Sequence, residues 1–204
     1  RLKFLPSSRI CLDSRLIWRG RYINALEAGG YPDNADILRR VPFEPASNFR
    51  EAVQSLWFTF AFVRLCGNWP GIGRIDMLLG EYLERDLADG KITLDEAREL
   101  LAHFFIKGCE WVSGGDYSSG DAQHYQNILL GGIDDEDGSV ECNVTYLVLD
   151  IIDELGISDF PITVRISPES SDELLYRVAN TIRYGGGIIA LYNEPLIIDA
   201  LTKF

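Results

Sequence analysis

The first half of the chain repeats apolar side chains at the three- and four-residue spacing of amphipathic helices. This pattern covers residues 48–65 and 72–87 and returns after Thr93, so we expect three helices there. Thr93 and Glu96 stand at the start of the last helix, where each side chain can accept a hydrogen bond from the other residue's backbone N–H. The helix over 48–65 is apolar over more than half of its circumference, which predicts burial on most sides.

Four prolines and the pair Gly29-Gly30 interrupt residues 1–46. The prolines are Pro6, Pro32, Pro42 and Pro45. Because proline stops helices, we predict an irregular wrapping segment with one short helix near residues 16–27. The regular helices and strands are expected in residues 47–204.

Short apolar runs alternate with amphipathic stretches in the second half. The runs at 126–133, 161–166 and 188–192 predict strands. The stretches that follow them begin with helix-capping residues: Asn143, the pair Ser170 and Glu173, and Asn193. The β-branched content of the stretch after Asn143 leaves a strand open as an alternative there. Strand followed by helix, three times in succession, predicts an α/β fold.

Composition and charge narrow the possible functions. The 204 residues carry a formal net charge of −12, which repels phosphate backbones and anionic lipid, so neither nucleic acid nor a membrane is an expected partner. The four cysteines have no short spacing, so we expect buried free thiols in a reducing cytoplasm. With His103 and His124 they would offer ligands for zinc, but no closely spaced ligand pair occurs, and no metal is expected.

Polar side chains crowd the entrance to the strand at 126–133, in the sequence GDAQHYQNILLGG. At strand spacing His124 and Gln126 share one face, and Asp121 precedes them. Polar groups that enter a buried strand need partners, because an unpaired one costs about 1–3 kcal/mol. The wall of a pocket and an internal hydrogen-bond network meet this need equally well.

Three other motifs are better explained as structural. Gly185-Gly186-Gly187 precedes a strand and lacks a lysine, which favours a turn over a phosphate-binding loop. The acidic turn Asp134–Gly138 cannot be a calcium loop, because Ile133 and Val144 would occupy the first and twelfth positions. Gly73-Arg74-x-Asp76 predicts a salt-bridged structural corner.

Four stretches, taken in order, resemble the middle of glycyl radical enzymes, the pyruvate formate-lyase-like family. They are NFREAVQSLWFTF, GIGRIDMLLGEYLERDLADGKITLDEARELL, GDAQHYQNILLGGIDDEDG and FPITVRISPESSDELLYRVANTIRYGGGIIALYNEPLIIDAL. The similarity runs from about Phe43 to Phe204. The resemblance implies part of a ten-stranded β/α barrel of two half-barrels, surrounded by helices. It also implies radical chemistry on a small-molecule substrate, with a glycyl radical installed by an S-adenosylmethionine iron–sulfur activating enzyme.

The sequence departs from the family in one large respect. The family's radical-bearing glycine and cysteine loops lie beyond Phe204 in its order, and neither motif occurs in this chain. The chain also starts without Met and stops inside a predicted helix. We therefore expect residues 1–204 to be an internal portion of the enzyme domain, without bound cofactor and inactive alone. It would need the rest of its polypeptide, and the full-length protein would form a homodimer.

The resemblance also suggests where the substrate lies. Residues 119–124 match a stretch of pyruvate formate-lyase that reads S-G-D-P-T-W, whose Trp lines the active site. This places His124 on a pocket wall, with Asp121 and Gln126 beside it. The segment before Gly73 supplies substrate contacts in the family, and here it contains Asn68 and Trp69.

Imidazole in place of indole, and Asn-Trp in place of small residues, argue against pyruvate as the substrate. They favour a lyase or eliminase that acts on a small polar substrate. The alternatives are formate C-acetyltransferase activity itself, or a non-catalytic scaffold or binding module.

Overall fold

The computed structural model describes residues 4–65, 70–109, 126–136, 138–157, 160–185 and 187–203. Its helices are α1 (Phe4–Ala28), α2 (Pro32–Arg40), α3 (Phe49–Arg64), α4 (Ile75–Ala88), α5 (Leu94–Cys109), α6 (Asn143–Leu155), α7 (Asp172–Tyr184) and α8 (Glu194–Thr202). Its strands are β1 (Gly73–Arg74), β2 (Ile128–Gly131), β3 (Ile162–Ile166) and β4 (Ile189–Asn193). From β2 onward strands and helices alternate as the sequence predicts, and the stretch after Cys142 is a helix rather than a strand.

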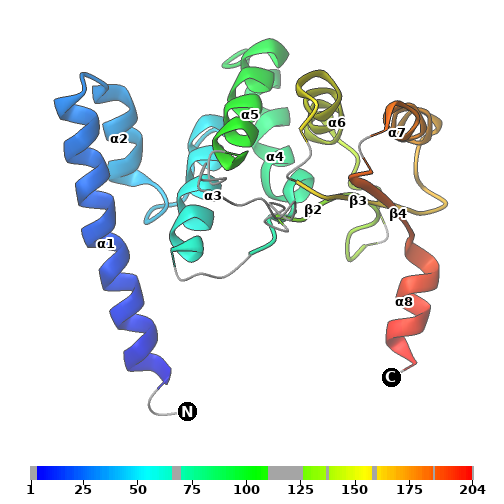
Figure 1. Cartoon of the computed structure of the whole chain (residues 1–204), viewed down its shortest axis with the longest axis horizontal. Helices are drawn as coiled ribbons and strands as arrows, with labels where there is room; N and C mark the ends of the chain where they lie inside the picture. Colours follow the sequence, from blue (N-terminus) through cyan, green and yellow to red (C-terminus); the bar gives the residue numbers. More distant parts are fainter. Residues whose placement is uncertain are drawn as a thin grey trace, which may run out of the picture.

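The strands form one parallel sheet in the order β1-β2-β3-β4. Alternate side chains of β2 and β3 are fully buried and join the hydrophobic core with residues of α4 to α7: Ile128, Leu130, Ile162 and Val164. Figure 1 shows α6 and α7 above the strands, whereas α8 runs downward from the end of β4. The helices thus cover one face of the sheet. The parallel, helix-covered sheet confirms the α/β prediction.

The first 46 residues differ from the predicted irregular segment with one short helix. They form α1 and α2, which are joined at Gly30, whose φ of 83° suits glycine. Pro6 and Pro32 lie in the first turns of helices, where the N–H that proline lacks would have no partner within the helix, and Pro42 lies just past a helix end, which proline cannot continue. The prediction is wrong because these prolines bound helices instead of excluding them.

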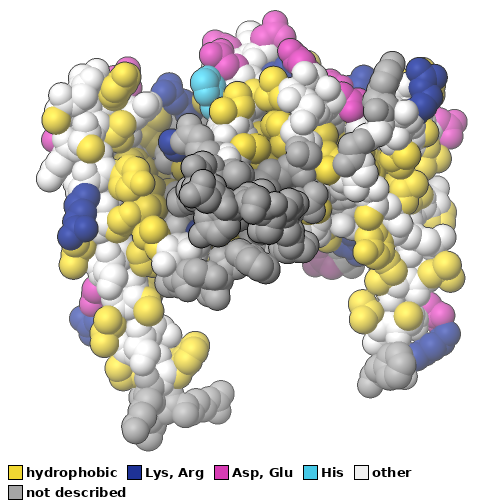
Figure 2. Space-filling model, viewed as in Figure 1, with side chains coloured by type: hydrophobic (Ala, Val, Ile, Leu, Met, Phe, Trp, Pro, Cys, Tyr) yellow, Lys and Arg dark blue, Asp and Glu magenta, His cyan; other side chains and the backbone are white. Residues whose placement is uncertain are grey.

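Two helices project from the body of the molecule with apolar side chains exposed. Helix α1 has no buried residue along its 25 residues. Figure 2 shows hydrophobic side chains along both α1 and α8. They are Phe4, Leu5, Ile10, Leu12, Leu16, Ile17 and Tyr22 on α1, and Leu196, Ile198 and Leu201 on α8. Clustered exposed apolar side chains are typical of contact surfaces, as expected for part of a longer polypeptide.

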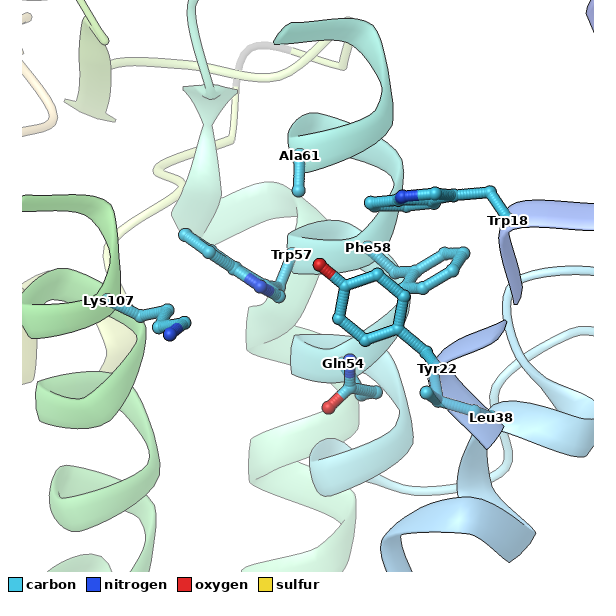
Figure 3. A pocket seen from close by; sticks show the side chains of 8 residues that line it. All are labelled: Trp18, Tyr22, Leu38, Gln54, Trp57, Phe58, Ala61 and Lys107. Carbon is cyan, nitrogen blue, oxygen red and sulfur yellow. The ribbon is translucent and has the colours of Figure 1, made fainter. Parts of the chain in front are cut away.

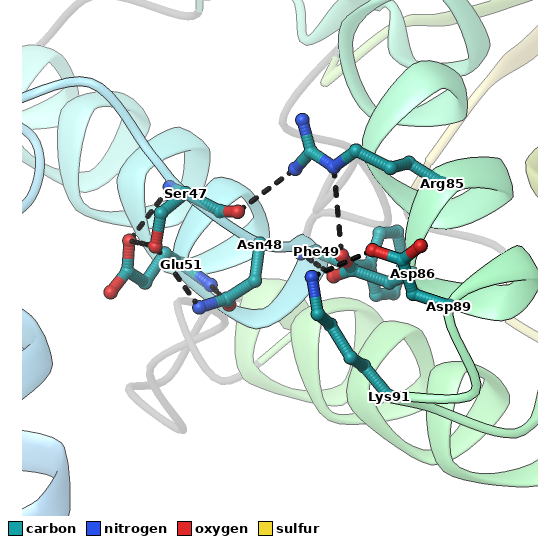
Figure 4. Close-up of polar contacts among 8 residues, drawn as sticks. All are labelled: Ser47, Asn48, Phe49, Glu51, Arg85, Asp86, Asp89 and Lys91. Carbon is teal, nitrogen blue, oxygen red and sulfur yellow. Dashed lines mark hydrogen bonds and ion pairs between the residues drawn. The ribbon is translucent and has the colours of Figure 1, made fainter.

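Polar side chains attach the start of α3 to α4 (Figure 4). The Asn48 side chain accepts a hydrogen bond from the Glu51 N–H at 2.9 Å, and the Glu51 carboxylate accepts one from the Ser47 N–H at 2.8 Å. From α4, the buried Asp86 carboxylate accepts the Phe49 N–H at 2.6 Å. Two N–H groups of the first turn of α3, and that of Ser47 just before the cap, are thereby satisfied, which confirms the predicted helix start.

The other predicted caps are correct or displaced by one residue. Glu96 and Thr93 exchange the expected hydrogen bonds at 2.8 and 3.2 Å, and Asn193 caps α8. Helix α6 is capped by Cys142 instead of Asn143, and α7 by Ser171 instead of Ser170.

Candidate functional site

Of the five predicted pocket residues, the structure describes Gln126. The other four lie in residues 66–69 and 110–125, outside the described part of the chain: Asn68, Trp69, Asp121 and His124. The first of these segments runs from α3 to β1, and the second runs from α5 to β2. Their flanking residues are described, so the structure shows where both segments leave and re-enter the fold.

The backbone entering β1 lies against the backbone entering β2. The Asn127 carbonyl oxygen accepts hydrogen bonds from the Ile72 and Gly73 N–H groups at 2.9 and 3.1 Å. On its other side, β2 is joined to the entry of β3, because the Ile128 N–H donates to the Pro161 carbonyl at 2.9 Å. The two segments with the predicted pocket residues therefore rejoin the sheet at neighbouring positions.

The Gln126 side chain links the helices from which the same two segments leave. Its Oε1 accepts a hydrogen bond from Arg64 Nη1, at the end of α3, at 2.7 Å. Its Nε2 donates to the Gly108 carbonyl oxygen, near the end of α5, at 3.4 Å. Gln126 is fully buried. Of the two explanations open at the level of sequence, an internal hydrogen-bond network describes this residue.

Asn127 belongs to the opposite face of the sheet. Its side-chain Oδ1 accepts a hydrogen bond from Thr163 Oγ1 on β3 at 3.3 Å, and both residues are half-buried. The sequence prediction passed over Asn127. The alternation of faces along the strand separated it from Gln126, but did not show which face the helices cover.

An internal ion pair lies at the carboxyl-terminal edge of the sheet, beside Gly132. Glu194, only 1% exposed, pairs with Arg165 of β3 and accepts the Ile133 N–H at 3.2 Å. Gly132 has a φ of +81°, and a Cβ atom there would lie 2.0 Å from Glu194 Oε2. Open α/β sheets usually bind ligands at this edge, but here an internal ion pair occupies the space beside Gly132.

The Gly73-Arg74-x-Asp76 motif forms a structural corner around Gly131. Asp76 Oδ2 accepts the Gly131 N–H at 2.6 Å, and Arg74 Nη2 donates to the Gly131 carbonyl oxygen at 3.2 Å. Thr145 of α6 donates to the same Asp76 oxygen at 3.4 Å. The motif thus attaches the start of α4 to the end of β2.

Burial raises the pKa of Asp76 from its ordinary value near 3.8 to about 6. The N–H groups of Gly131 and Met77, the positive charge of Arg74 and the hydroxyl of Thr145 favour the charged carboxylate and oppose this rise. Desolvation outweighs them because Asp76 is only 1% exposed.

A groove of about 320 Å³ lies between the α1–α2 hairpin and helices α3 and α5. Figure 3 shows Trp18 and Tyr22 on the α1 side, Trp57 and Phe58 on α3, and Lys107 reaching from α5 toward Trp57. Gln126, the one predicted pocket residue that the structure describes, does not line it. Its walls come from four separate helices, so no local sequence signal could have identified it.

The remaining predictions concern thiols, metals and membranes. Cys11 is exposed, and Cys109 and Cys142 are half-buried, so the prediction of buried thiols is wrong for Cys11; Cys66 lies outside the described residues. Across the described ranges, no cluster of three or more His, Cys, Asp or Glu side chains is arranged to hold a metal ion. Nor does any helix in those ranges combine the length and apolarity needed to cross a bilayer.

Comparison with known proteins gives consistent matches. The family model described as "Pyruvate formate lyase-like" matches residues 33–204. The chain is 34% identical, over 96% of its length, to isethionate sulfite-lyase of Nitratidesulfovibrio vulgaris (strain ATCC 29579 / DSM 644 / CCUG 34227 / NCIMB 8303 / VKM B-1760 / Hildenborough). It is 30% identical, over 80% of its length, to trans-4-hydroxy-L-proline dehydratase of Clostridioides difficile.

A solved structure agrees with these matches. It concerns 1,2-propanediol dehydration in Roseburia inulinivorans and superimposes with a TM-score of 0.81 at 25% identity, covering 94% of this chain and 26% of that chain. The chain likewise spans 26% of the sulfite-lyase and 22% of the hydroxyproline dehydratase.

Proposed function

Because the chain belongs to the pyruvate formate lyase-like family of glycyl radical enzymes, we propose that it is an internal portion of a lyase or eliminase that acts on a small polar substrate. The observation that carries this proposal is the 34% identity to a sulfite-lyase along 96% of the chain. A dehydratase is similar as well, which supports elimination over acyl transfer.

This chain contributes strands and pocket wall. The radical-bearing residues belong to other parts of the polypeptide and supply hydrogen-atom abstraction. The proposed partners are those other parts, the activating enzyme and a second copy in a homodimer, all in the cytoplasm. His124, Asp121, Asn68 and Trp69 are proposed to line the pocket. Gln126 is proposed to have a supporting structural role, since it ties together α3, α5 and β2.

The test uses the full-length protein, activated anaerobically by its S-adenosylmethionine-dependent partner. We expect a carbon-centred doublet in the electron paramagnetic resonance spectrum. We also expect turnover of at least one of three probes: isethionate, trans-4-hydroxy-L-proline or 1,2-propanediol. Turnover of pyruvate and coenzyme A instead would assign the acyltransferase. A full-length protein that forms no radical would contradict the enzyme assignment.

The variant His124→Ala tests the pocket in the same protein. If His124 donates or accepts a proton at the substrate, turnover should fall by roughly 100-fold with little change in the melting temperature. If it belongs to a structural network, the folded protein should lose about 1–3 kcal/mol of stability and keep near-normal turnover. Measuring both quantities on one preparation separates the two roles.

A further inference from the structure

Asn127 occupies the face of the sheet that the helices leave uncovered. Its neighbours Gln126 and Ile128 are both fully buried, and successive side chains of extended backbone point to opposite faces. Thr163 likewise points to the face opposite to Ile162 and Val164, which are buried in the core under the helices. The hydrogen bond between Asn127 and Thr163 confirms that these two side chains share one face.

One hydrogen bond from Thr163 orients the Asn127 side-chain amide. Thr163 Oγ1 donates to its Oδ1 at 3.3 Å, so the two N–H donors of Nδ2 are directed away from Thr163. Within the described part of the chain, the Asn127 Nδ2 group makes no hydrogen bond. A half-buried amide whose two Nδ2 donors have no partner among the described residues suits an oxygen acceptor of a ligand.

The uncovered face is the one that would face a barrel interior. In a barrel surrounded by helices, the face packed against helices is the outer one. Here that face carries Gln126, Ile128 and Ile162, so Asn127 and Thr163 belong to the inner face. The superposition on the solved enzyme with a TM-score of 0.81 supports this orientation.

We propose that Asn127 contacts the substrate, donating a hydrogen bond from Nδ2 to a hydroxyl, carboxylate or sulfonate oxygen. Thr163 is a positioning residue that fixes the direction of this donor. The proposal rests on the proposed function and names the part of the substrate that this strand recognises. Two adjacent side chains would then have different roles. Gln126 hydrogen-bonds to residues of α3 and α5, and Asn127 hydrogen-bonds to the substrate.

The experiment begins with the activated full-length enzyme and the three probes isethionate, trans-4-hydroxy-L-proline and 1,2-propanediol. A wild-type protein with no radical, or with no turnover of any probe, overturns the proposed function and this inference with it, before any variant is made. With turnover established, kcat and KM of the variants are measured on the probe that reacts.

Two substitutions test the contact itself. Asn127→Asp keeps the shape and the acceptor for Thr163 but replaces the donor with a carboxylate, and Asn127→Ser shortens the side chain. We expect kcat/KM to fall about tenfold or more in both, the factor that corresponds to one lost hydrogen bond. Melting temperatures should stay close to that of the wild type, because Nδ2 donates no hydrogen bond within the described residues.

Thr163→Val tests the positioning role, and Thr163→Ser is the matched rescue. Valine frees the amide to rotate, so kcat/KM should fall about threefold, and serine should restore it because it keeps the hydroxyl. The control is Thr181→Val, which removes a hydroxyl that donates to Asp153 at 2.8 Å between α7 and α6. It should lower the melting temperature and leave kcat/KM within about twofold of the wild type.

Wild-type kcat/KM in both Asn127 variants would overturn the inference. So would an equal loss of kcat/KM in Thr181→Val, which would show that any loss of packing lowers activity. Failure of both Asn127 variants to fold would assign a structural role to the amide and also contradict the proposal.

Discussion

Asp76→Asn should remove a pH dependence of local stability at the corner between α4 and β2. Asp76 accepts the Gly131 N–H at 2.6 Å and the Met77 N–H at 2.9 Å through different carboxylate oxygens. Asparagine has one acceptor oxygen, so its NH₂ group must face one of these donors. The loss of one hydrogen bond to a charged group costs about 1.5–3 kcal/mol.

Removing the buried charge of Asp76 raises the stability, which is opposite to the effect of the lost hydrogen bond. The pKa of Asp76 in the folded protein, about 6, lies above its ordinary value near 3.8. A raised pKa means that the group contributes stability fully below about pH 3.8, and that this contribution is lost as the pH rises through about 6. A rise of about two units corresponds to about 3 kcal/mol. This net rise already includes the hydrogen bonds from Gly131 and Met77. Relative to the wild type, the asparagine variant, which cannot ionise, should therefore gain stability as the pH rises from about 4 to about 7.

Amide hydrogen exchange at Gly131 in the full-length protein measures this directly. After correction for intrinsic rates, protection in the wild type relative to Asp76→Asn should decrease by up to about 3 kcal/mol between pH 4 and pH 7. The control is Glu96→Gln, which removes a carboxylate in the remote cap of α5 and should leave the Gly131 profile unchanged. Parallel pH profiles for wild type and Asp76→Asn would refute the argument.

Two further predictions concern packing and the isolated chain. Gly132→Ala should cost about 2–4 kcal/mol, because φ is +81° and the new Cβ would meet Glu194 Oε2 at 2.0 Å. Gly90→Ala, with φ +66° and open space around it, should cost only about 1–2 kcal/mol; equal denaturation midpoints would contradict this. The isolated 204-residue chain should show no radical signal after activation and should unfold below roughly 45 °C, the lower end of the usual mesophilic range. A carbon-centred doublet, or a cooperative monomeric transition above roughly 45 °C, would count against it.

Local signals predicted most of the fold from residue 48 onward. The capping pair Thr93 and Glu96 and the cap Asn193 satisfy their own helix starts, so neighbouring residues suffice to identify them. Helix α1 gave no such signal, because its apolar residues follow no single face and Pro6 suggested interrupted backbone. Its stability depends on contacts with other segments, such as Trp18 against Phe58 of α3, and a local pattern does not contain them.

In the candidate site too, local sequence predicted which residues need partners but not which distant residues supply them. The sequence predicted that polar residues around Gln126 need partners, and the structure supplies them from Arg64 and Gly108. These partners lie 62 and 18 residues away, so no spacing rule could have named them. The carboxyl-terminal edge was missed for the same reason, since Arg165 and Glu194 meet across β3 and α8.

The alternation of side chains along β2 fixes which residues share a face, but not which face is covered. The sequence prediction chose Gln126 and passed over Asn127, but the helices pack on the Gln126 side. The pocket assignment of His124 therefore draws no support from sharing a face with Gln126 at strand spacing, because that face is the one that packs against helices. It rests on the resemblance to an active-site Trp alone. For this reason turnover and melting temperature must be measured together in His124→Ala, whereas for Asn127 the geometry of the sheet already favours one role.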